Sequence, residues 1–145
     1  RKGLCHRDIK PSNILFESDR YRLCDFEEAI IVNSEDLNIG NHRENTELLE
    51  PTTFAFCSPS FLQKIYKRKQ GYEDHKYFCP FKMDMYALGL TFVYFCSMGK
   101  FNVEDRLSFT NNKLVHEEFI REQRRKFVKE NPNFESFNVI VKAML

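Results

Sequence analysis

The segment HRDIKPSNILF, residues 6–16, constrains the fold of this 145-residue chain more than any other stretch. It places a histidine, an arginine, an aspartate, a lysine and an asparagine directly before the apolar run Ile14–Phe16. Polar groups of this kind, if buried without partners, would each cost on the order of 1–3 kcal/mol. Their concentration at the mouth of a strand therefore favours a ligand-binding site. The alternative is a polar turn that satisfies its own backbone.

The alternating segment NILFESDRYRLCDF, residues 13–26, is typical of a β-hairpin. Ile14–Phe16 and Tyr21–Cys24 are the expected strands, because both are apolar runs of strand length. Ser18 and Asp19 between them are turn-forming residues. The sequence therefore predicts two short strands joined by a tight turn.

This hairpin would bring the candidate ligands of a metal ion together. Folding residue 25 back toward residue 13 lets Asn13 and Asp25 converge on one point. An amide oxygen and a carboxylate are hard oxygen ligands, which Mg²⁺ accepts while it keeps waters and bridges phosphates. Asp8 could then accept a proton from a hydroxyl, and Lys10 could neutralise charge on a phosphoryl group.

The rest of the chain reads as one long loop followed by helices. Residues 27–51 have no clear period and predict a long loop, which in compact domains is usually functional or disordered. Helices are expected over residues 58–71, 84–98 and 114–130, and one more begins at Phe137. The segment over 84–98 is the most apolar, but it is shorter than the ~20 residues that span a bilayer, so a buried helix is expected.

Composition limits the classes of protein that fit. An apolar share of 42%, a charged share of 30% and a net charge of +1 are ordinary for a soluble single domain and give no bias toward nucleic acid or membrane. The basic runs KIYKRK and REQRRK could bind acidic partners, but solvated helix faces explain them better. Five well-separated cysteines without a close pair predict free thiols in an intracellular, cytoplasmic setting and argue against zinc.

Five motifs in this chain resemble those of the eukaryotic protein kinase family, in the family's order. They are HRDIKPSN (6–13), DFE (25–27), TFAFCSPS (53–60), DMYALG (84–89) and VIVKAML (139–145). The resemblance implies a serine/threonine kinase and a partial kinase domain over residues 1–145. Its parts would be a catalytic loop at 6–13, an activation segment at 25–60 and a central helix at 84–98. The fold class it implies is α+β: a mainly helical C-terminal lobe (C-lobe) with a small β-hairpin at the active site and the N-terminal lobe (N-lobe) absent.

The resemblance also implies the roles of the reacting groups and the cofactors. Asp8 would be the catalytic base, and Lys10 would contact the transferring phosphate. Asn13 and Asp25 would hold Mg²⁺. ATP and a protein substrate would be the partners, with neither nucleic acid nor membrane involved, and the oligomeric state stays open. Lys10, where tyrosine kinases usually carry a small residue, points to serine and threonine hydroxyls.

Supporting roles follow from the same resemblance. His6 would pack under the turn that contains Phe26, and Arg7 would pair with a phosphorylated residue. Thr53 would face Asp8 and Lys10 at the floor of the peptide site. Asp84 would hydrogen-bond the backbone of the catalytic loop. The candidate phosphorylation sites are Ser34, Thr46 and Thr52, with an unmodified polar loop as the alternative.

The chain departs from the family pattern at three positions. Glu27 and Thr52 stand where the family has glycine, and Ser60 stands where it has glutamate. Because glycine permits backbone angles that a side chain resists, Glu27 is expected to stiffen or displace its turn. The glycines are not spaced as G-x-G-x-x-G, and no V-A-I-K strand occurs. We therefore expect a piece of a longer kinase that is inactive alone, with a pseudokinase or binding module as the alternative.

Overall fold

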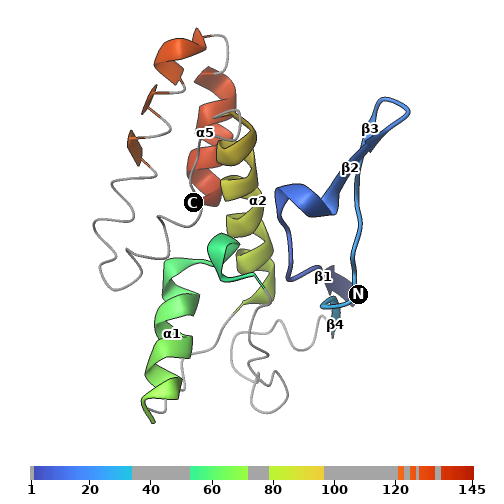
Figure 1. Ribbon diagram of the computed structural model, residues 1–145, viewed down its shortest axis with the longest axis vertical. Helices are drawn as coiled ribbons and strands as arrows, with labels where there is room; N and C mark the ends of the chain where they lie inside the picture. The colour runs from blue at the N-terminus through green and yellow to red at the C-terminus, as the bar shows by residue number, and fades with distance from the viewer. Residues whose placement is uncertain are drawn as a thin grey trace.

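The computed structural model of the chain describes residues 2–33, 53–71, 79–96, 121–122, 125–126, 128–132 and 135–145. Its elements in chain order are β1 (Lys2–Cys5), the 3-10 turn η1 (Pro11–Asn13), β2 (Ile14–Glu17), β3 (Arg20–Leu23), β4 (Ile30–Asn33), the 3-10 turn η2 (Phe54–Phe56), α1 (Pro59–Lys69), α2 (Pro80–Cys96) and α5 (Glu135–Met144). The strands gather on one side of α2, and α5 packs along α2 (Figure 1). Within the expected helix over 114–130, residues 121–122, 125–126 and 128–130 are helical.

The β2–β3 hairpin forms where the sequence predicts it. The two strands pair antiparallel from Ile14 opposite Leu23 to Glu17 opposite Arg20, which leaves a two-residue loop. Both loop residues, Ser18 and Asp19, have positive φ angles of 50° and 61°. Two positive φ values define the turn type whose twist matches that of the strands. A hydrogen bond of 3.0 Å from the Cys24 N–H to the Asn13 carbonyl extends the ladder by one step.

A second small sheet, β1–β4, was not predicted. Its strands pair antiparallel from Lys2 opposite Asn33 to Cys5 opposite Ile30. One face packs toward α2: a Cβ on Gly3 would lie 2.5 Å from the Phe81 ring, so a larger residue would require this ring to move. The sheet therefore fixes the chain on both sides of the polar segment at 6–13.

Helix α2 forms the centre of the core. It begins at Pro80, a residue suited to a first helical position, and so starts four residues before the predicted boundary. Leu90 and Thr91 are fully buried, and the Thr91 hydroxyl donates to the Ala87 carbonyl at 2.8 Å. The core cluster consists of Ile9, Phe56, Tyr86, Ala87, Leu90, Val93 and Val141. In the described part of the chain, no helix has the length and apolarity needed to cross a membrane.

Helix α1 starts and ends close to its predicted limits. The Ser58 hydroxyl accepts a hydrogen bond of 3.3 Å from the Phe61 N–H, Pro59 follows at the first helical position, and Gly71 lies just past the end with a φ of 81°. The helix packs on α2 through a second buried cluster. Its members are Cys57, Phe61, Ile65 and Met83.

The expected fold class is wrong. We expected a mainly helical C-lobe with one small hairpin and the N-lobe absent. The described chain instead opens with four strands in two separate sheets over its first 33 residues, and the helices follow. The β1–β4 sheet pairs residues about thirty positions apart through a short strand that contains glycine, and local patterns do not reveal such pairing.

Candidate active site

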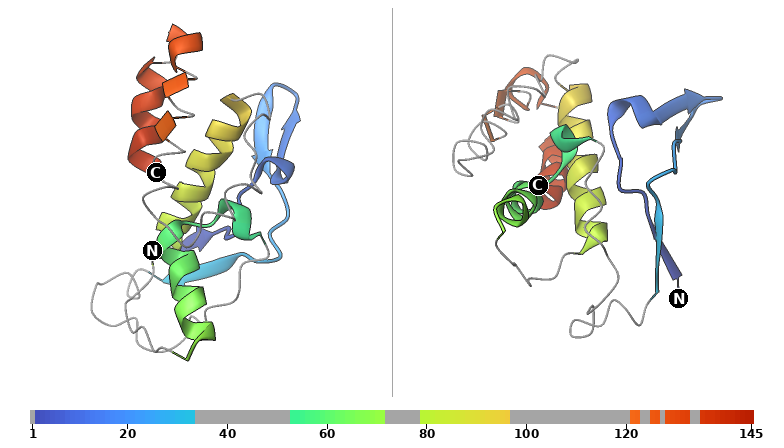
Figure 2. Two further views of the ribbon diagram at one scale, coloured as in Figure 1. Left: turned by 60° about the vertical axis from the view of Figure 1, so that its left-hand side comes forward. Right: turned by 60° about the horizontal axis from the view of Figure 1, so that its bottom comes forward.

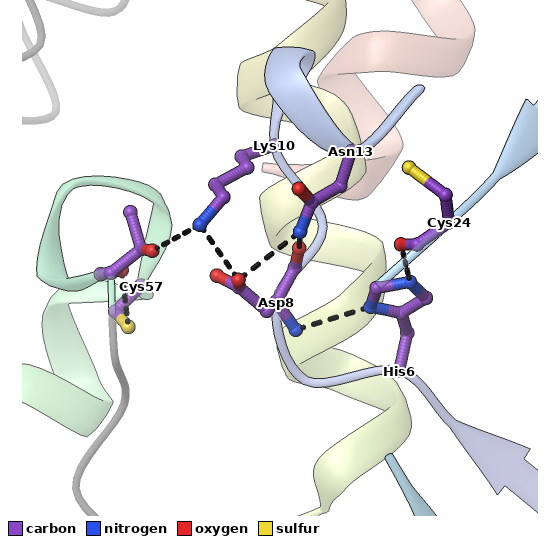
Figure 3. A network of polar contacts seen from close by, with 7 residues as sticks. His6, Asp8, Lys10, Asn13, Cys24 and Cys57 are labelled. Atoms are coloured by element: carbon purple, nitrogen blue, oxygen red, sulfur yellow. Dashed lines mark hydrogen bonds and ion pairs between the residues drawn. The ribbon is translucent and has the colours of Figure 1, made fainter. Parts of the chain in front are cut away.

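Asp8 is the centre of a buried polar network in the loop between β1 and η1. Its carboxylate forms an ion pair with Lys10, 2.7 Å from Oδ2 to Nζ (Figure 3). The amide nitrogen of Asn13 donates to the same carboxylate oxygen at 3.1 Å and to the Asp8 carbonyl at 2.9 Å. Asp8 and Asn13 are both buried. The turn η1, which starts at Pro11, brings positions 8, 10 and 13 to one point.

Thr53 joins this network from a distant part of the chain. Its hydroxyl accepts a hydrogen bond from Lys10 Nζ at 2.9 Å. Burial is the largest influence on the pKa of Asp8 and would raise it. The hydrogen bonds with Lys10, Thr53 and Asn13 and the charge of Lys10 together outweigh burial and hold this pKa below its usual value. The carboxylate is therefore ionised and oriented at neutral pH.

Asp84 on α2 anchors the backbone of the loop. Its two carboxylate oxygens accept the N–H groups of His6 at 2.6 Å and Arg7 at 2.8 Å. Arg7 has a φ of 68°, a conformation that non-glycine residues seldom adopt and that these bonds help to hold. Burial raises the pKa of Asp84 above its ordinary value, although the two N–H groups act in the opposite direction.

His6 connects the Asp8 loop to the segment after β3. Its Nδ1 accepts the Asp8 N–H at 3.4 Å, and its Nε2 lies 3.0 Å from the Cys24 carbonyl. Because a backbone N–H can only donate, Nδ1 acts as acceptor, and the protonated Nε2 donates a hydrogen bond to the Cys24 carbonyl. The His6 ring also contacts the Phe26 ring, with centroids 4.6 Å apart. The buried imidazole therefore sets the position of Asp8 relative to Asp25, the residue between Cys24 and Phe26.

The oxygens of Asn13 and Asp25 fit a hard cation such as Mg²⁺. The Asn13 amide nitrogen donates to Asp8, so the amide oxygen is the atom of this side chain that could bind a cation. Asp25 is exposed, has a φ of 63°, and directly follows Cys24, whose N–H bonds the Asn13 carbonyl. The described residues contain no group of three or more His, Cys, Asp or Glu side chains that could hold a metal. A cation here would complete its coordination with water and substrate oxygens, as Mg²⁺ does.

Glu27 does not strain its turn. The described non-glycine residues with positive φ are Arg7, Ser18, Asp19 and Asp25, so the left-handed angle of this turn lies two residues before Glu27. The Ala29 N–H closes the turn on the Phe26 carbonyl at 3.0 Å. A side chain is therefore accepted at position 27.

The structure brings most of the predicted site residues into this network. His6, Asp8, Lys10 and Asn13 contact one another directly or through one neighbour, and Thr53 and Asp84 reach them from elsewhere in the chain. Ser34, Thr46 and Thr52 lie outside the described residues.

Two contributions to the network were missed in the sequence. One is the Cys24 carbonyl, which bonds His6. It was missed because every residue has a backbone carbonyl, so the residue type does not show which carbonyl will act as an acceptor. The other is the Cys57 thiol, which donates to the Thr53 carbonyl at 3.4 Å. The four-residue spacing between Thr53 and Cys57, a spacing at which a side chain can reach back to a carbonyl in a helical turn, was the available signal.

Comparison with known proteins points to one family. The model of the family described as "Protein kinase domain" matches residues 1–145. A probable serine/threonine-protein kinase MRK1 homolog of Encephalitozoon cuniculi is 28% identical over 115 residues, which cover 79% of this chain and 30% of that protein. A serine/threonine-protein kinase stk11 homolog of Dictyostelium discoideum is 31% identical over 98 residues, which cover 68% of this chain and 14% of that protein.

The extent of these matches bears on the predicted architecture. The chain spans less than a third of the length of either relative. No solved structure matches it significantly. The family match begins at residue 1, directly before the strand-rich part of the chain, and this overturns the expectation of a helical lobe with the N-lobe absent.

Proposed function

This chain belongs to the protein kinase family, and we propose that the protein containing it transfers the γ-phosphate of ATP to serine and threonine hydroxyls of protein substrates. Both relatives described above carry the name serine/threonine-protein kinase. In this proposal residues 6–13 are the catalytic loop, residues 25–60 the activation segment and α2 the central helix. We also propose an intracellular location, in keeping with the four free cysteines of the described residues.

One observation carries the proposal: the buried, ionised Asp8 carboxylate held between Lys10 and Asn13. An oriented carboxylate of this kind can accept the proton of an incoming hydroxyl and align its oxygen for attack. Lys10, which bridges Asp8 and Thr53, can stabilise charge that develops on a transferred phosphoryl group. A lysine at this position also supports serine and threonine substrates.

Asn13 and Asp25 are the residues that would hold Mg²⁺. When bound, Mg²⁺ neutralises charge on phosphate oxygens and orients ATP. The protein's own part is to hold the backbone before Asp25 beside that of Asn13, through the β2–β3 ladder and the Cys24–Asn13 hydrogen bond. The contact between the His6 and Phe26 rings holds Phe26, the residue after Asp25, against the loop that contains Asp8.

Regulation by phosphorylation is part of the proposal. A phosphate on Ser34, Thr46 or Thr52 would add charge and acceptors that an arginine can engage, and Arg7 is the proposed partner. Phosphosite mapping of the protein from cells under activating conditions tests this idea. A segment that stays unmodified there contradicts it.

The decisive test replaces Asp8 by asparagine in the full-length protein. Phosphoryl transfer from ATP to serine and threonine peptides, assayed with Mg²⁺, should fall by about 10²- to 10⁴-fold, the usual contribution of a positioned base. Glu17→Gln is the matched control, since Glu17 is an exposed carboxylate that pairs with Arg22 outside the site. The 145 residues alone, which contain no glycine-rich phosphate loop, should show no transfer.

A pseudokinase or binding module is the second candidate, and Glu27 and Ser60 favour it. In that case the full-length wild type gives no transfer with Mg²⁺ and ATP, and Asp8→Asn leaves partner binding unchanged. The relaxed backbone at Glu27 weakens this alternative.

A further inference from the structure

A buried thiol lies at the edge of the Asp8 network. Cys57 is 6% exposed, and its Sγ donates to the Thr53 carbonyl at 3.4 Å (Figure 3). None of the proposed steps uses this group. It follows Phe56, the last residue of η2, and precedes α1 by two residues. The thiol therefore lies between the helical core and the reacting groups.

Thr53 is tied to its surroundings at two atoms. Its hydroxyl accepts Lys10 Nζ at 2.9 Å, and its carbonyl accepts the Cys57 thiol. Lys10 in turn contacts the Asp8 carboxylate at 2.7 Å. A continuous path of hydrogen bonds thus leads from Cys57 through Thr53 and Lys10 to Asp8.

The other side of Cys57 is held by packing. It belongs to the cluster with Phe61, Ile65 and Met83, which joins α1 to α2. Close-packed side chains of this kind have little room to move, so the thiol has a fixed position. Through its bond to Cys57, Thr53 is therefore held in a fixed position relative to α1 and α2.

The space next to Thr53 explains why its hydrogen bond with Cys57 matters. A cavity of about 10 Å³ lies beside it, with Arg7, Asp8, Thr53, Cys57 and Asp84 among its lining residues. This is room for about one water molecule. Packing alone does not hold Thr53 on that side.

We propose that Cys57 is a positioning residue of the active site, which holds Thr53 through its carbonyl and so keeps Lys10 in place beside Asp8. The inference rests on the function proposed above for Asp8 and Lys10. In this inference Cys57 acts through its hydrogen bond to the Thr53 carbonyl.

Serine and alanine at position 57 separate this role from packing. Serine keeps a donor: the Thr91 hydroxyl makes the same bond to a carbonyl four residues earlier, at 2.8 Å. Alanine keeps an apolar side chain and loses the donor. If Cys57 only packs, serine is the worse replacement, because it places a hydroxyl in an apolar cluster. If Cys57 positions Thr53, alanine is worse.

The test compares Cys57→Ala and Cys57→Ser in the full-length protein. For Cys57→Ala we expect kcat to fall by about three- to ten-fold, in keeping with one weak S–H bond, with KM for peptide unchanged. Cys57→Ser should restore most of the loss. Ile65→Val removes a methyl group from the same cluster without touching a hydrogen bond, and Cys79→Ala removes a thiol elsewhere. Both controls should leave kcat unchanged.

A spectroscopic measurement separates this inference from the proposed function. The carbonyl ¹³C shift of Thr53 and the side-chain ¹⁵N shift of Lys10 should move in Cys57→Ala and return in Cys57→Ser, whether or not the protein turns over. Unmoved shifts, or serine worse than alanine in both measurements, would overturn the proposal. Moved shifts in an inactive wild type would uphold the positioning contact and reject the kinase reaction instead.

Discussion

Asp84 shows how a single carboxylate can hold a loop and still weaken folding by its charge. It accepts two backbone N–H groups, yet burial outweighs them and raises its pKa. Arg7 and His6 face it from the loop, and Cys5 lies close enough for the Asp84 charge to raise the Cys5 pKa as well. The folded state therefore holds the Asp84 proton more tightly than the unfolded state does.

The sign of the resulting pH dependence follows from linkage. Because the pKa of Asp84 is raised in the folded state, its contribution to the free energy of unfolding is fully present below the ordinary aspartate pKa, about 3.9. This contribution is lost as the pH rises through the pKa of Asp84 in the folded protein. Asp84→Asn cannot titrate and keeps one acceptor oxygen. The melting temperature of the Asp84→Asn variant should lie below that of the wild type. This difference in melting temperature should shrink as the pH is raised from about 4, because only the wild type loses stability. Melting curves of both proteins across this range test the prediction, and a gap that widens with pH contradicts it.

Cys5 should be chemically inert in the folded protein. It is fully buried, and burial together with the charges of Asp84 and Cys79 raises its pKa to about 12. Only the thiolate attacks alkylating reagents, so Cys5 should react with iodoacetamide at neutral pH only after unfolding. Cys24, which is partly exposed, serves as the internal comparison. Peptide mass spectrometry reads out both sites, and equal labelling of the two in the native state would refute the expectation.

At the scale of elements, Gly89 lies where the end of α5 packs closely against α2. A Cβ there would lie 2.9 Å from the Met144 Cβ and 3.0 Å from the Leu145 Cδ2. Alanine favours a helix over glycine by up to about 1 kcal/mol, but overpacking costs typically about 1–3 kcal/mol. Gly89→Ala should therefore lower the free energy of unfolding in urea, because α5 is pushed from α2. Lys82→Ala, at an exposed site of α2, should leave it within about 0.5 kcal/mol, and a stabilised Gly89→Ala would show that the helices separate freely.

Local patterns predicted the elements whose signals are local. The hairpin follows from alternation and from Ser18–Asp19, and α1 follows from Ser58, Pro59 and Gly71. The β1–β4 sheet was missed because each strand has only four residues and their pairing is remote. The start of α2 at Pro80 was missed because the apolar run over 84–98 set the predicted boundary, although proline suits a first helical turn.

The candidate site also contains contributions that the sequence predicted and others that it missed. Asp8, Lys10 and Asn13 could be predicted as site residues because polar side chains before a strand need partners. The structure places the three side chains in contact. The contribution of the Cys24 carbonyl depends on tertiary geometry, which residue type does not show. The Cys57 thiol lies only four residues after Thr53, and this local spacing was overlooked in the sequence.

At the scale of the whole molecule, the chain has a helical core with a hairpin that stands clear of it. Figure 2 shows β2–β3 projecting from α2 and α5 in its right-hand view. Two-stranded hairpins are at best marginally stable alone in water. The exposed apolar side chains of this hairpin are Leu15, Phe16, Tyr21 and Leu23. Such a surface favours association.

The 145 residues expressed alone should therefore self-associate through this hairpin. Phe16 and Tyr21 lie opposite each other, are 62% and 76% exposed, and have tilted rings in contact with centroids 4.9 Å apart. Replacing them together, as Phe16→Lys with Tyr21→Glu, keeps an opposite-charge pair across the strands while it removes the apolar surface. Sedimentation over a range of concentrations should show association of the wild type and a shift toward monomer in this double variant.

A matched control decides whether the hairpin or net surface charge is responsible. Gln63→Lys with Gln70→Glu adds the same two charges at exposed polar positions on and just after α1. This control should associate like the wild type, since its apolar hairpin is intact. If it becomes monomeric to the same extent, added charge alone prevents association; if the wild type is monomeric at every concentration, the exposed hairpin needs no covering partner.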